Sequence, residues 1–552
     1  MEASNNMEWN ISQNEIVALS IGLSIVVFSA FYTLTFGFYT NTSSFANNGT
    51  FFVKKWAFIL AVLALNAVGC FLVYQFQDLQ VILYVILALK SKDLLSSLIF
   101  VFVMIYKHLF TDLSIPKRAV TDEIRRIVAF VPVYKESMDQ LKRTVDSVLS
   151  STVVPHYILT CIVSDGKNDY KDIMDHIISS EEVCYKNWLG VLSYIKVFYG
   201  TRGDRHIVLL AKTENSGKKD SILLAHSIFN TTSPNTLNSS VEHIKSSVLK
   251  TLLSTFGVDR FDFVFATDAD TVIDTNAISC LMDSIEKRDA IASCGIVNAD
   301  NSEGTWFWNS LQNYQYLYGQ YTRRSVEDIC NQVLCLPGCI SMLRLHKNGD
   351  QVVKMYSEIP DKHTFVLSNV QYVGTDRRLT GSLIYTDTDK TVKTVMDLRC
   401  HAYTLPPQNV SDFTAQRRRW CQNTYFNTMI NVIAPNVNVL LRLFCLIDVL
   451  RQSLVYFRLF NTMFFLYLLI TQFNPDKVLG LVPYIVILVY PTVFFFIYSI
   501  FNQHLRKQWF SLAFTFIINK IFVTLSSISI FSVMLFNIGY DSWAKPEAIQ
   551  QV

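Results

Sequence analysis

Long apolar segments lie near both ends of the chain, and between them short apolar runs alternate with polar stretches. Residues 16–38 and 56–74 are long enough to cross a bilayer, which takes about 20 apolar residues in a helix. Residues 81–110 form a third apolar region, interrupted near its middle by Lys90, Lys92 and Asp93. This pattern predicts an N-terminal membrane region of three spans within residues 1–112.

The apolar pattern returns after residue 430. An amphipathic stretch comes first and predicts an interfacial helix, and apolar segments at 454–470, 478–501 and 521–538 predict three further spans within residues 431–552. Basic residues follow the third N-terminal segment and also separate the last two C-terminal segments: Lys107, Lys117, Arg118, Arg125, Arg126, His504, Arg506 and Lys507. The positive-inside rule therefore places the central residues 113–430 in the cytosol and the N-terminus outside.

The central region has the pattern of an α/β domain. Runs at 127–133, 158–163 and 261–266 are short enough for strands, and helix-like polar stretches separate them. Strands that alternate with helices predict a predominantly parallel sheet, in which ligands bind beyond the carboxyl ends of the strands. Candidate functional residues are therefore expected where these runs end.

Composition supports a membrane protein. The chain is 51% hydrophobic and only 17% charged, whereas an ordinary soluble domain is roughly 25% charged. The formal net charge of +3 is small and dispersed, so no nucleic-acid partner is expected. The eleven cysteines form no paired CxxC clusters, which favours reduced thiols in a cytosolic body.

The strand that ends at residue 266 is followed by Asp268 and Asp270. Two carboxylates one residue apart at a turn can face the same divalent ion, and hard oxygen ligands suit Mg²⁺ or Mn²⁺ on a diphosphate. Such pairs also occur in ordinary surface turns. The position directly after a buried strand favours the metal interpretation.

The other strand ends carry groups that suit a nucleotide. Tyr134 and Glu136 follow the first strand and Asp165 follows the second, so that a ring and carboxylates could stack on and hydrogen-bond a base. Lys218 and Lys219, in the sequence NSGKKDS, offer cations to a phosphate. The alternative is that these residues only form and solvate turns.

Two later motifs have both a chemical and a structural interpretation. Asp376, in GTDRRLT, is a candidate general base for a sugar hydroxyl, or else one half of an ion pair with its neighbouring arginines. The sequence QRRRW at 416–420 offers Arg419 to a phosphate and the face of Trp420 to a sugar, or else anchors the chain at the membrane interface.

Taken together, these motifs resemble those of the chitin synthase family of processive, membrane-embedded family 2 glycosyltransferases. The resemblance covers residues 120–430 and rests on VPVYKE, SDG, NSGKKDS, TDAD, CLPGC, GTDRRLT and QRRRW in that order. It extends weakly to SWAK at 542–545. The resemblance implies a cytosolic domain of the GT-A fold, with N- and C-terminal transmembrane helices, in the plasma membrane.

The resemblance also implies an activity: inverting transfer of N-acetylglucosamine from UDP-N-acetylglucosamine to the 4-hydroxyl of a growing β-1,4 chain, coupled to export through the bilayer. It implies that Asp376 is the general base and that Asp268 and Asp270 bind the diphosphate and the metal. The implied UDP site contains Tyr134, Glu136, Asp165, Lys218 and Lys219. The implied acceptor site for the nascent chitin chain contains Pro337, Gly338, Cys339, Gln416, Arg419 and Trp420.

Two positions depart from the family pattern. Thr375 stands where the family has an acidic residue, which leaves the base without a second carboxylate beside it, and Lys545 follows SWA where the family has threonine or arginine.

Two alternative functions remain open. A hyaluronan synthase shares the base motif and QxxRW but also requires UDP-glucuronate. A transporter with a regulatory nucleotide-binding domain would need more ionisable residues within its spans.

Overall fold

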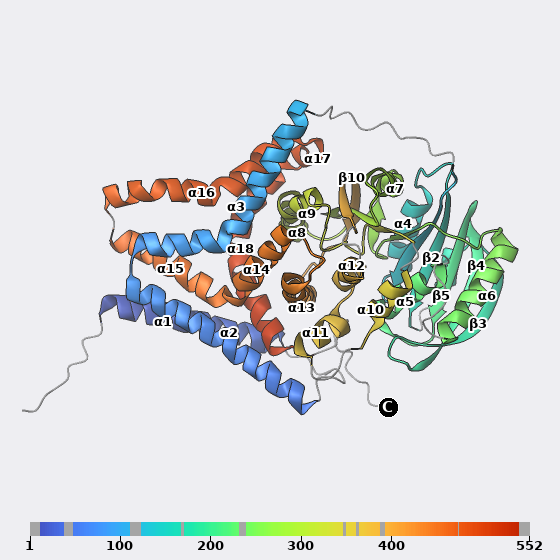
Figure 1. Ribbon diagram of the computed structural model, residues 1–552, viewed down its shortest axis with the longest axis horizontal. Helices are drawn as coiled ribbons and strands as arrows, with labels where there is room; N and C mark the ends of the chain where they lie inside the picture. Colours follow the sequence, from blue (N-terminus) through green and yellow to red (C-terminus); the bar gives the residue numbers. More distant parts are fainter. Residues whose placement is uncertain are drawn as a thin grey trace, which may run out of the picture.

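The computed structural model describes residues 12–37, 48–110, 123–166, 170–230, 239–345, 349–359, 364–386, 392–472 and 474–539. A body built around one β-sheet lies at one end of the molecule, and long helices from both ends of the sequence lie at the other (Figure 1). The expected SWAK motif and Asn41 fall outside the described residues.

In the described part of the chain, ten strands form one mixed sheet in the order β3-β4-β5-β2-β1-β6-β9-β8-β10-β7. The strands are β1 (Arg126–Val133), β2 (Tyr157–Asp165), β3 (His176–Lys186), β4 (Leu192–Arg202), β5 (Arg205–Lys212), β6 (Phe263–Ala266), β7 (Thr271–Ile273), β8 (Ala292–Ala299), β9 (Ser341–Arg344) and β10 (Thr394–Thr404). Strand β1 is parallel to both β2 and β6, and Val133 pairs with Ser164 while Phe130 pairs with Ala266. The carboxyl ends of these three strands therefore meet at one edge.

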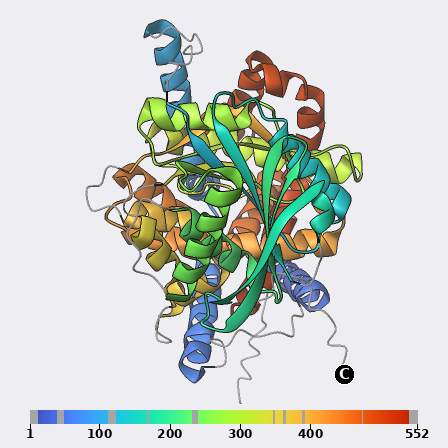
Figure 2. The same ribbon diagram turned by 90° about the vertical axis from the view of Figure 1, so that its right-hand side faces the viewer.

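The predicted α/β class is confirmed, but the prediction of a predominantly parallel sheet is wrong. Four strand pairs are parallel (β1–β2, β1–β6, β2–β5 and β8–β10), and the other five are antiparallel. Tight turns at Gly190 and Gly203, whose φ angles are 81° and 57°, connect β3, β4 and β5 as antiparallel neighbours. In Figure 2 these teal and green strands curl in front of the rest of the body.

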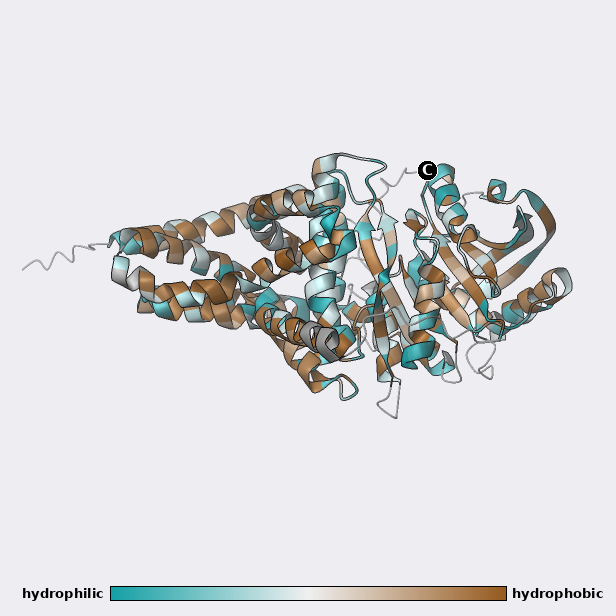
Figure 3. Cartoon of the chain, turned by 90° about the horizontal axis from the view of Figure 1, so that it is seen from above, coloured by the Kyte–Doolittle hydropathy of each residue, from teal (hydrophilic) through white to brown (hydrophobic). Residues whose placement is uncertain are grey.

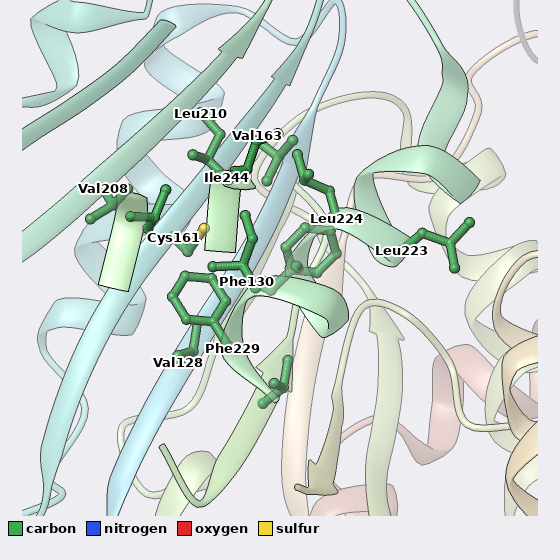
Figure 4. Close-up of a cluster of buried hydrophobic side chains, with 14 of the residues drawn as sticks. Val128, Phe130, Cys161, Val163, Val208, Leu210, Leu223, Leu224, Phe229 and Ile244 are labelled. Atoms are coloured by element: carbon green, nitrogen blue, oxygen red, sulfur yellow. The ribbon is translucent and has the colours of Figure 1, made fainter. Parts of the chain in front are cut away.

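Helices cover both faces of the sheet because successive side chains of each strand point to opposite sides. Val128 and Phe130 pack against one group of helices, whereas Ile127 and Ala129 lie in a separate core on the other face. Figure 4 shows the first core, where strand residues meet Leu223, Leu224 and Phe229 of α5 and Ile244 of α6. The first face is covered by α5 (Gly217–Phe229) and α6 (Ser239–Phe256), and the second by α4 (Met138–Leu149) and α7 (Ala277–Arg288).

The remaining elements of the body lie between the strands or, for the last helix, after them. They are η1 (Lys171–Ile173), α8 (Trp306–Gly319), the π-helical turn η2 (Gln320–Arg324), α9 (Ser325–Ile329), α10 (Gly349–Ser357), α11 (Phe365–Val373), α12 (Asp376–Tyr385) and α13 (Val410–Ile433).

The apolar helices are brown along most of their length in Figure 3. They are α1 (Gln13–Phe36), α2 (Gly49–Phe76), α3 (Leu79–Phe110), α14 (Val439–Ser453), α15 (Val455–Thr471), α16 (Pro475–Phe501) and α18 (Trp509–Phe536). The short polar helix α17 (Gln503–Arg506) lies between α16 and α18. Among the described residues, α1, α2 and residues Leu479–Phe501 of α16 are each long and apolar enough to cross a membrane. The number rises to five if two bent helix pairs each count as one span.

The bent pairs differ from the expected straight spans. Helices α14 and α15 meet at 73°, and α18 bends by 61° between Trp509–Lys520 and Thr524–Phe536. The bend in α18 follows the polar residues Asn519 and Lys520. The third expected N-terminal span is helix α3, which is not among the candidate spans and carries Lys90, Lys92 and Asp93 near its middle.

Polar contacts connect the membrane helices to the body. Asp93 of α3 accepts hydrogen bonds from Arg323 of η2 at 2.9 Å and from Arg451 of α14 at 2.9 Å. The short helix α17, which joins α16 to α18, contacts the body through His504, whose Nε2 lies 2.8 Å from Oδ1 of Asn298 in β8. The basic segment at 504–507 therefore contacts the sheet domain through His504.

Candidate active site

The candidate site begins at the common edge where β1, β2 and β6 end. Tyr134 follows β1, and a Cβ atom added to Gly166 would lie 3.8 Å from its ring. Asp165 is the last residue of β2 and is buried. The ring of Tyr134 and the carboxylate of Asp165 thus come from neighbouring strands, as the sequence predicted.

Glu136 stabilises the turn that presents Tyr134. One of its carboxylate oxygens accepts hydrogen bonds from the backbone N–H groups of Tyr134 at 2.7 Å and Lys135 at 3.1 Å. The hydroxyl of Tyr170 donates to the Glu136 carbonyl at 2.9 Å. Sequence reasoning placed Glu136 among ligand-binding groups, and the structure adds this local role.

The two aspartates after β6 have different surroundings. Asp268 is about one-third exposed and lies 2.5 Å from the ammonium of Lys218. Asp270 accepts hydrogen bonds from the hydroxyls of Thr271 and Thr404. Burial, with added repulsion from Asp268 and Glu136, raises the pKa of Asp270 to about 7. Crowded carboxylates of this kind are stabilised by a cation.

These two carboxylates fit a divalent ion that completes its coordination from elsewhere. In the described residues, no group of three or more His, Cys, Asp and Glu side chains has the arrangement of a metal site. Mg²⁺ commonly binds through one or two carboxylates together with substrate phosphates and water. Asp268 and Asp270 therefore suit an ion that arrives with a diphosphate.

Lys218, near the start of α5, lies between Asp268 after β6 and Asp376 at the start of α12. Its ammonium lies 2.5 Å from Asp268 and 3.9 Å from Asp376. Burial alone would lower the pKa of Lys218, but the two carboxylates raise it above its usual value. The same lysine and Asp376 line a small, mainly apolar cavity in the body.

Gly338, in CLPGC, fits closely against this charged pair. A Cβ atom there would lie 2.7 Å from Oδ1 of Asp376 and 2.9 Å from Nζ of Lys218. Burial raises the pKa of Asp376, while Lys218 and the backbone N–H of Gly338 favour its ionised form. Cys339 beside it is buried, and burial raises the pKa of its thiol.

Asp376 is the first residue of α12, and neighbouring bonds hold it against the CLPGC segment. The hydroxyl of Thr380 donates to the Asp376 carbonyl at 2.8 Å and accepts from the backbone N–H of Leu336 at 3.1 Å. Pro337 begins a turn in which its carbonyl accepts from the N–H of Ile340 at 3.2 Å.

The cation closest to Asp376 is Lys218 rather than a neighbouring arginine. Arg378 instead donates to the Gln371 side chain and to the Met355 carbonyl, both at 3.3 Å. Arg378 therefore forms no ion pair with Asp376, whereas the other neighbouring arginine, Arg377, favours the ionised form of that carboxylate and lowers its pKa.

Lys219 is directed away from the Lys218 ammonium. Its own ammonium donates to the Gln371 carbonyl at 2.5 Å and lies 4.1 Å from the Trp188 ring centroid and 5.3 Å from that of Tyr356. Burial, with repulsion from Arg378, lowers the pKa of Lys219 to about 7. Lys219 thus joins α5 to α11, beside the helix that carries Asp376.

Trp420 lies on α13 in an aromatic group that sequence reasoning missed. Its ring is 6.0 Å from that of Tyr316 on α8, and the Arg417 guanidinium lies 4.3 Å from its centroid. Arg417 also contacts the rings of Phe413 at 5.0 Å and Tyr316 at 5.4 Å. Trp420 keeps 44% of its surface exposed, so one part of the indole remains available to a ligand.

The other predicted residues of this helix are partly or fully covered. Gln416 has a buried Oε1 atom without a hydrogen-bond partner in the described part of the chain. Arg419 is half-buried. The sequence QRRRW did not predict that Arg417 lies among aromatic rings. One of these rings comes from α8, about 100 residues earlier, and the others come from α13.

Comparison with known proteins identifies the family. The model for the family described as chitin synthase matches residues 194–540. The chain belongs to the chitin synthase family. The match includes Lys218, Asp268, Asp376 and Trp420, whereas Tyr134 and Asp165 precede it. The predicted resemblance is confirmed, and so is an α/β body with apolar helices at both ends.

Several fungal members of the chitin synthase family are similar in sequence. Chitin synthase 8 of Gibberella zeae is 25% identical over an alignment of 437 residues, and the match covers 73% of this chain and 64% of that protein. Chitin synthase Vb of Fusarium oxysporum f. sp. lycopersici is 28% identical over 56% of this chain and 19% of its own length. The chain thus spans less than two thirds of either relative.

Two solved glycosyltransferases are similar in structure at low sequence identity. The mannosyltransferase PcManGT from Pyrobaculum calidifontis, in complex with GDP-Man and Mn²⁺, has a TM-score of 0.43 at 10% identity and covers 82% of this chain and 99% of its own. GalNAc-T7 with UDP, GalNAc and Mn²⁺ has a TM-score of 0.29 at 10% identity, over 59% of this chain and 55% of its own.

Proposed function

We propose that this protein is a chitin synthase. It transfers N-acetylglucosamine from UDP-N-acetylglucosamine to the 4-hydroxyl of a growing β-1,4 chain with inversion, processively, and exports the product through the membrane. The observation that carries the proposal is the position of Lys218, whose ammonium lies between Asp268 and Asp376. The group that suits a diphosphate and the group that suits a sugar hydroxyl thus belong to one site.

The donor nucleotide binds at the ends of β1 and β2. Tyr134 stacks on the base, and the buried carboxylate of Asp165 hydrogen-bonds its edge. Lys218 approaches the diphosphate together with Asp268 and Asp270. Glu136 and Lys219 support this site by holding the turn after β1 and the start of α5 in place.

Transfer requires stabilisation of the leaving UDP and removal of one proton from the acceptor. A Mg²⁺ or Mn²⁺ ion held by Asp268 and Asp270 would neutralise charge on the diphosphate as the glycosidic bond breaks. Lys218 supplies a second, permanent positive charge at the same place. Asp376 accepts the proton of the attacking hydroxyl, and direct attack on the sugar inverts its anomeric centre.

The acceptor chain approaches from the side of α13. Trp420 offers its exposed indole face to the terminal sugar, and Gln416 and Arg419 lie on the same helix. Pro337, Gly338 and Cys339 border Asp376, where the acceptor hydroxyl must lie. Helix α13 leads into the membrane-associated helices, which supports an exit route through the bilayer.

Radiolabelled UDP-N-acetylglucosamine, supplied alone to the purified protein, tests this function. We expect incorporation into a polymer that chitinase degrades, and loss of synthesis in excess chelator. A product that resists chitinase, or full activity in chelator, would contradict the proposal. A requirement for added UDP-glucuronate would indicate a hyaluronan synthase instead.

A further inference from the structure

Positive charge gathers where the apolar helices meet the body. Five cationic side chains come together there from five elements: Lys90 of α3, Arg323 of η2, Arg451 of α14, Arg458 of α15 and Lys520 of α18. Helix α3 contacts η2, α14 and α15, and α15 contacts α18, so these elements are neighbours. Lys90 is repelled by the charges of Lys520, Arg451 and Arg458. Like charges among apolar helices are costly unless an anion compensates them.

One carboxylate, that of Asp93, compensates only part of this charge. Its Oδ1 accepts a hydrogen bond from Nε of Arg323 at 2.9 Å. Its Oδ2 accepts from Nη2 of Arg323 at 3.3 Å and from Nη1 of Arg451 at 2.9 Å. Both oxygens are thus engaged by two arginines. Asp448, which also lies at this junction, pairs with Lys92 and therefore leaves the balance of charge unchanged.

The remaining charge belongs to Lys90, Arg458 and Lys520. Within the described residues, none of these three side chains forms an ion pair with a carboxylate. Arg458 donates from Nη1 to the Arg451 carbonyl at 3.1 Å, and Nζ of Lys520 lies 5.0 Å from the ring centroid of Phe516. A carbonyl and a ring do not neutralise a full positive charge, so the three cations present an excess of charge to an anion.

We propose that Lys90, Arg458 and Lys520 bind the phosphate group of an anionic lipid. A phosphate offers several acceptor oxygens, which suits cations that come from three different helices. The surroundings favour a lipid as the source of this phosphate. Ile517, one turn before Lys520, is 65% exposed, and basic pockets between membrane helices on the cytosolic side bind lipid headgroups. The acyl chains would then lie against the apolar helices.

Native mass spectrometry of the full-length protein in detergent, titrated with phosphatidylserine or phosphatidylcholine, tests the proposal. We expect saturable binding of phosphatidylserine and weaker binding of zwitterionic phosphatidylcholine. Arg458→Gln and Lys520→Gln should each weaken phosphatidylserine binding by about fivefold, because each removes one cation from the site. The double variant should lose about 25-fold if the two effects add.

Three controls separate the site from other effects of charge. Arg458→Lys keeps the positive charge and should bind phosphatidylserine nearly as well as the unaltered protein. Lys54→Gln removes a half-buried lysine from a different apolar helix, α2, and should leave the affinity unchanged. Excess inorganic phosphate should not displace the lipid, because it lacks the apolar contacts of the acyl chains.

The remaining outcomes would overturn the inference. An equal loss of affinity in Lys54→Gln would show a general attraction of lipid to basic side chains. Unchanged affinity in the monodisperse double variant would show that these cations only extend toward the membrane surface; if that variant does not fold, the two single variants decide. Displacement by inorganic phosphate would reject a lipid as the source. None of these measurements requires sugar transfer, so the inference stands or falls independently of the proposed function.

Discussion

Gly338 illustrates how single residues shape this site. A side chain there would meet both Asp376 and Lys218 within 3 Å, so the glycine allows the base and the lysine to approach the same point. Burial raises the pKa of Asp376, and the positive charge of Lys218 opposes this increase. The charge state of Asp376 therefore depends on Gly338 and Lys218, which are both more than 35 positions away in the sequence.

Asp376→Asn should abolish sugar transfer and leave UDP binding nearly intact. The substitution removes the proton acceptor on the acceptor side without changing the residues at the ends of β1 and β2. Asp270→Ala should weaken both UDP binding and turnover, because it removes a ligand of the proposed divalent ion. Calorimetry with UDP and Mg²⁺ alongside a turnover assay separates the two effects, and appreciable synthesis by Asp376→Asn would rule out its role as the base.

Trp420→Ala should fold and bind UDP but lose polymer synthesis, while hydrolysis of the donor by water survives. Loss of the indole removes the surface that orients the acceptor, and small misplacement lowers the rate greatly. Arg417→Met should cause a smaller loss, since the guanidinium holds the indole from one side only. UDP release and polymer are measured separately on monodisperse protein.

A purely anchoring role predicts a different outcome for this helix. Trp420→Ala and Trp420→Phe would then reduce membrane insertion or stability and leave the specific activity of folded protein unchanged. Near-normal polymer from Trp420→Ala would reject the acceptor role.

At the scale of elements, a stacked histidine pair joins the sheet to the connection between two apolar helices. His401 of β10 and His504 of α17 have ring centroids 4.0 Å apart. Burial, with added repulsion from His504, lowers the pKa of His401 to about 4, and burial also lowers that of His504. An unfolded histidine has a pKa near 6.5, so this contact stabilises the fold fully only above about pH 6.5.

Acidification should therefore loosen the contact of α17 with the sheet. As the pH falls from 6.5 toward 4, the unfolded chain binds a proton that His401 resists, at a cost of up to about 3 kcal/mol. His401→Phe keeps a ring for stacking and should reduce this loss. Melting temperatures at pH 4.5 and 7 measure the effect, and the exposed His243→Gln serves as a control. Equal pH dependence in all three proteins would contradict the argument.

At the scale of the whole molecule, charged side chains at the junction connect parts that are far apart in sequence. Asp93 binds Arg323 of the body and Arg451 of α14, and Lys92 pairs with Asp448. These contacts explain why α3 carries charges in an otherwise apolar segment. Whether α3 crosses the membrane decides on which side of it the connection between α1 and α2 lies.

Asn41 and Asn48, each in an N-x-[ST] sequon, should remain unglycosylated. This prediction takes α3 as a third N-terminal span and the body as cytosolic, which would place the connection between the first two helices in the cytosol, together with Lys54 and Lys55. Asn10, in the sequon Asn10-Ile11-Ser12, should face outside. Treatment with a deglycosylating enzyme after expression in a eukaryotic host gives the mobility shifts, and modification at Asn41 or Asn48 would show that α3 does not span.

The sequence by itself determined the features that depend on local pattern. Apolar length indicated α1, α2 and α16, and short runs that end in polar residues indicated β1, β2 and β6 with Tyr134, Asp165 and Asp268 at their ends. Hydrophobic periodicity and length are properties of contiguous residues, so these elements required no knowledge of the tertiary fold.

Only the tertiary structure decided which of these residues act together. Lys212 pairs with Asp165 from 47 positions away and carries no motif, and Tyr316 contacts Arg417 from a separate helix. Strands β3 to β5 pair as antiparallel neighbours, whereas the pattern of the central region predicted strands that alternate with helices. Such contacts join residues distant in the sequence, so strand order and helix packing determine them, whereas local pattern determines only the elements themselves.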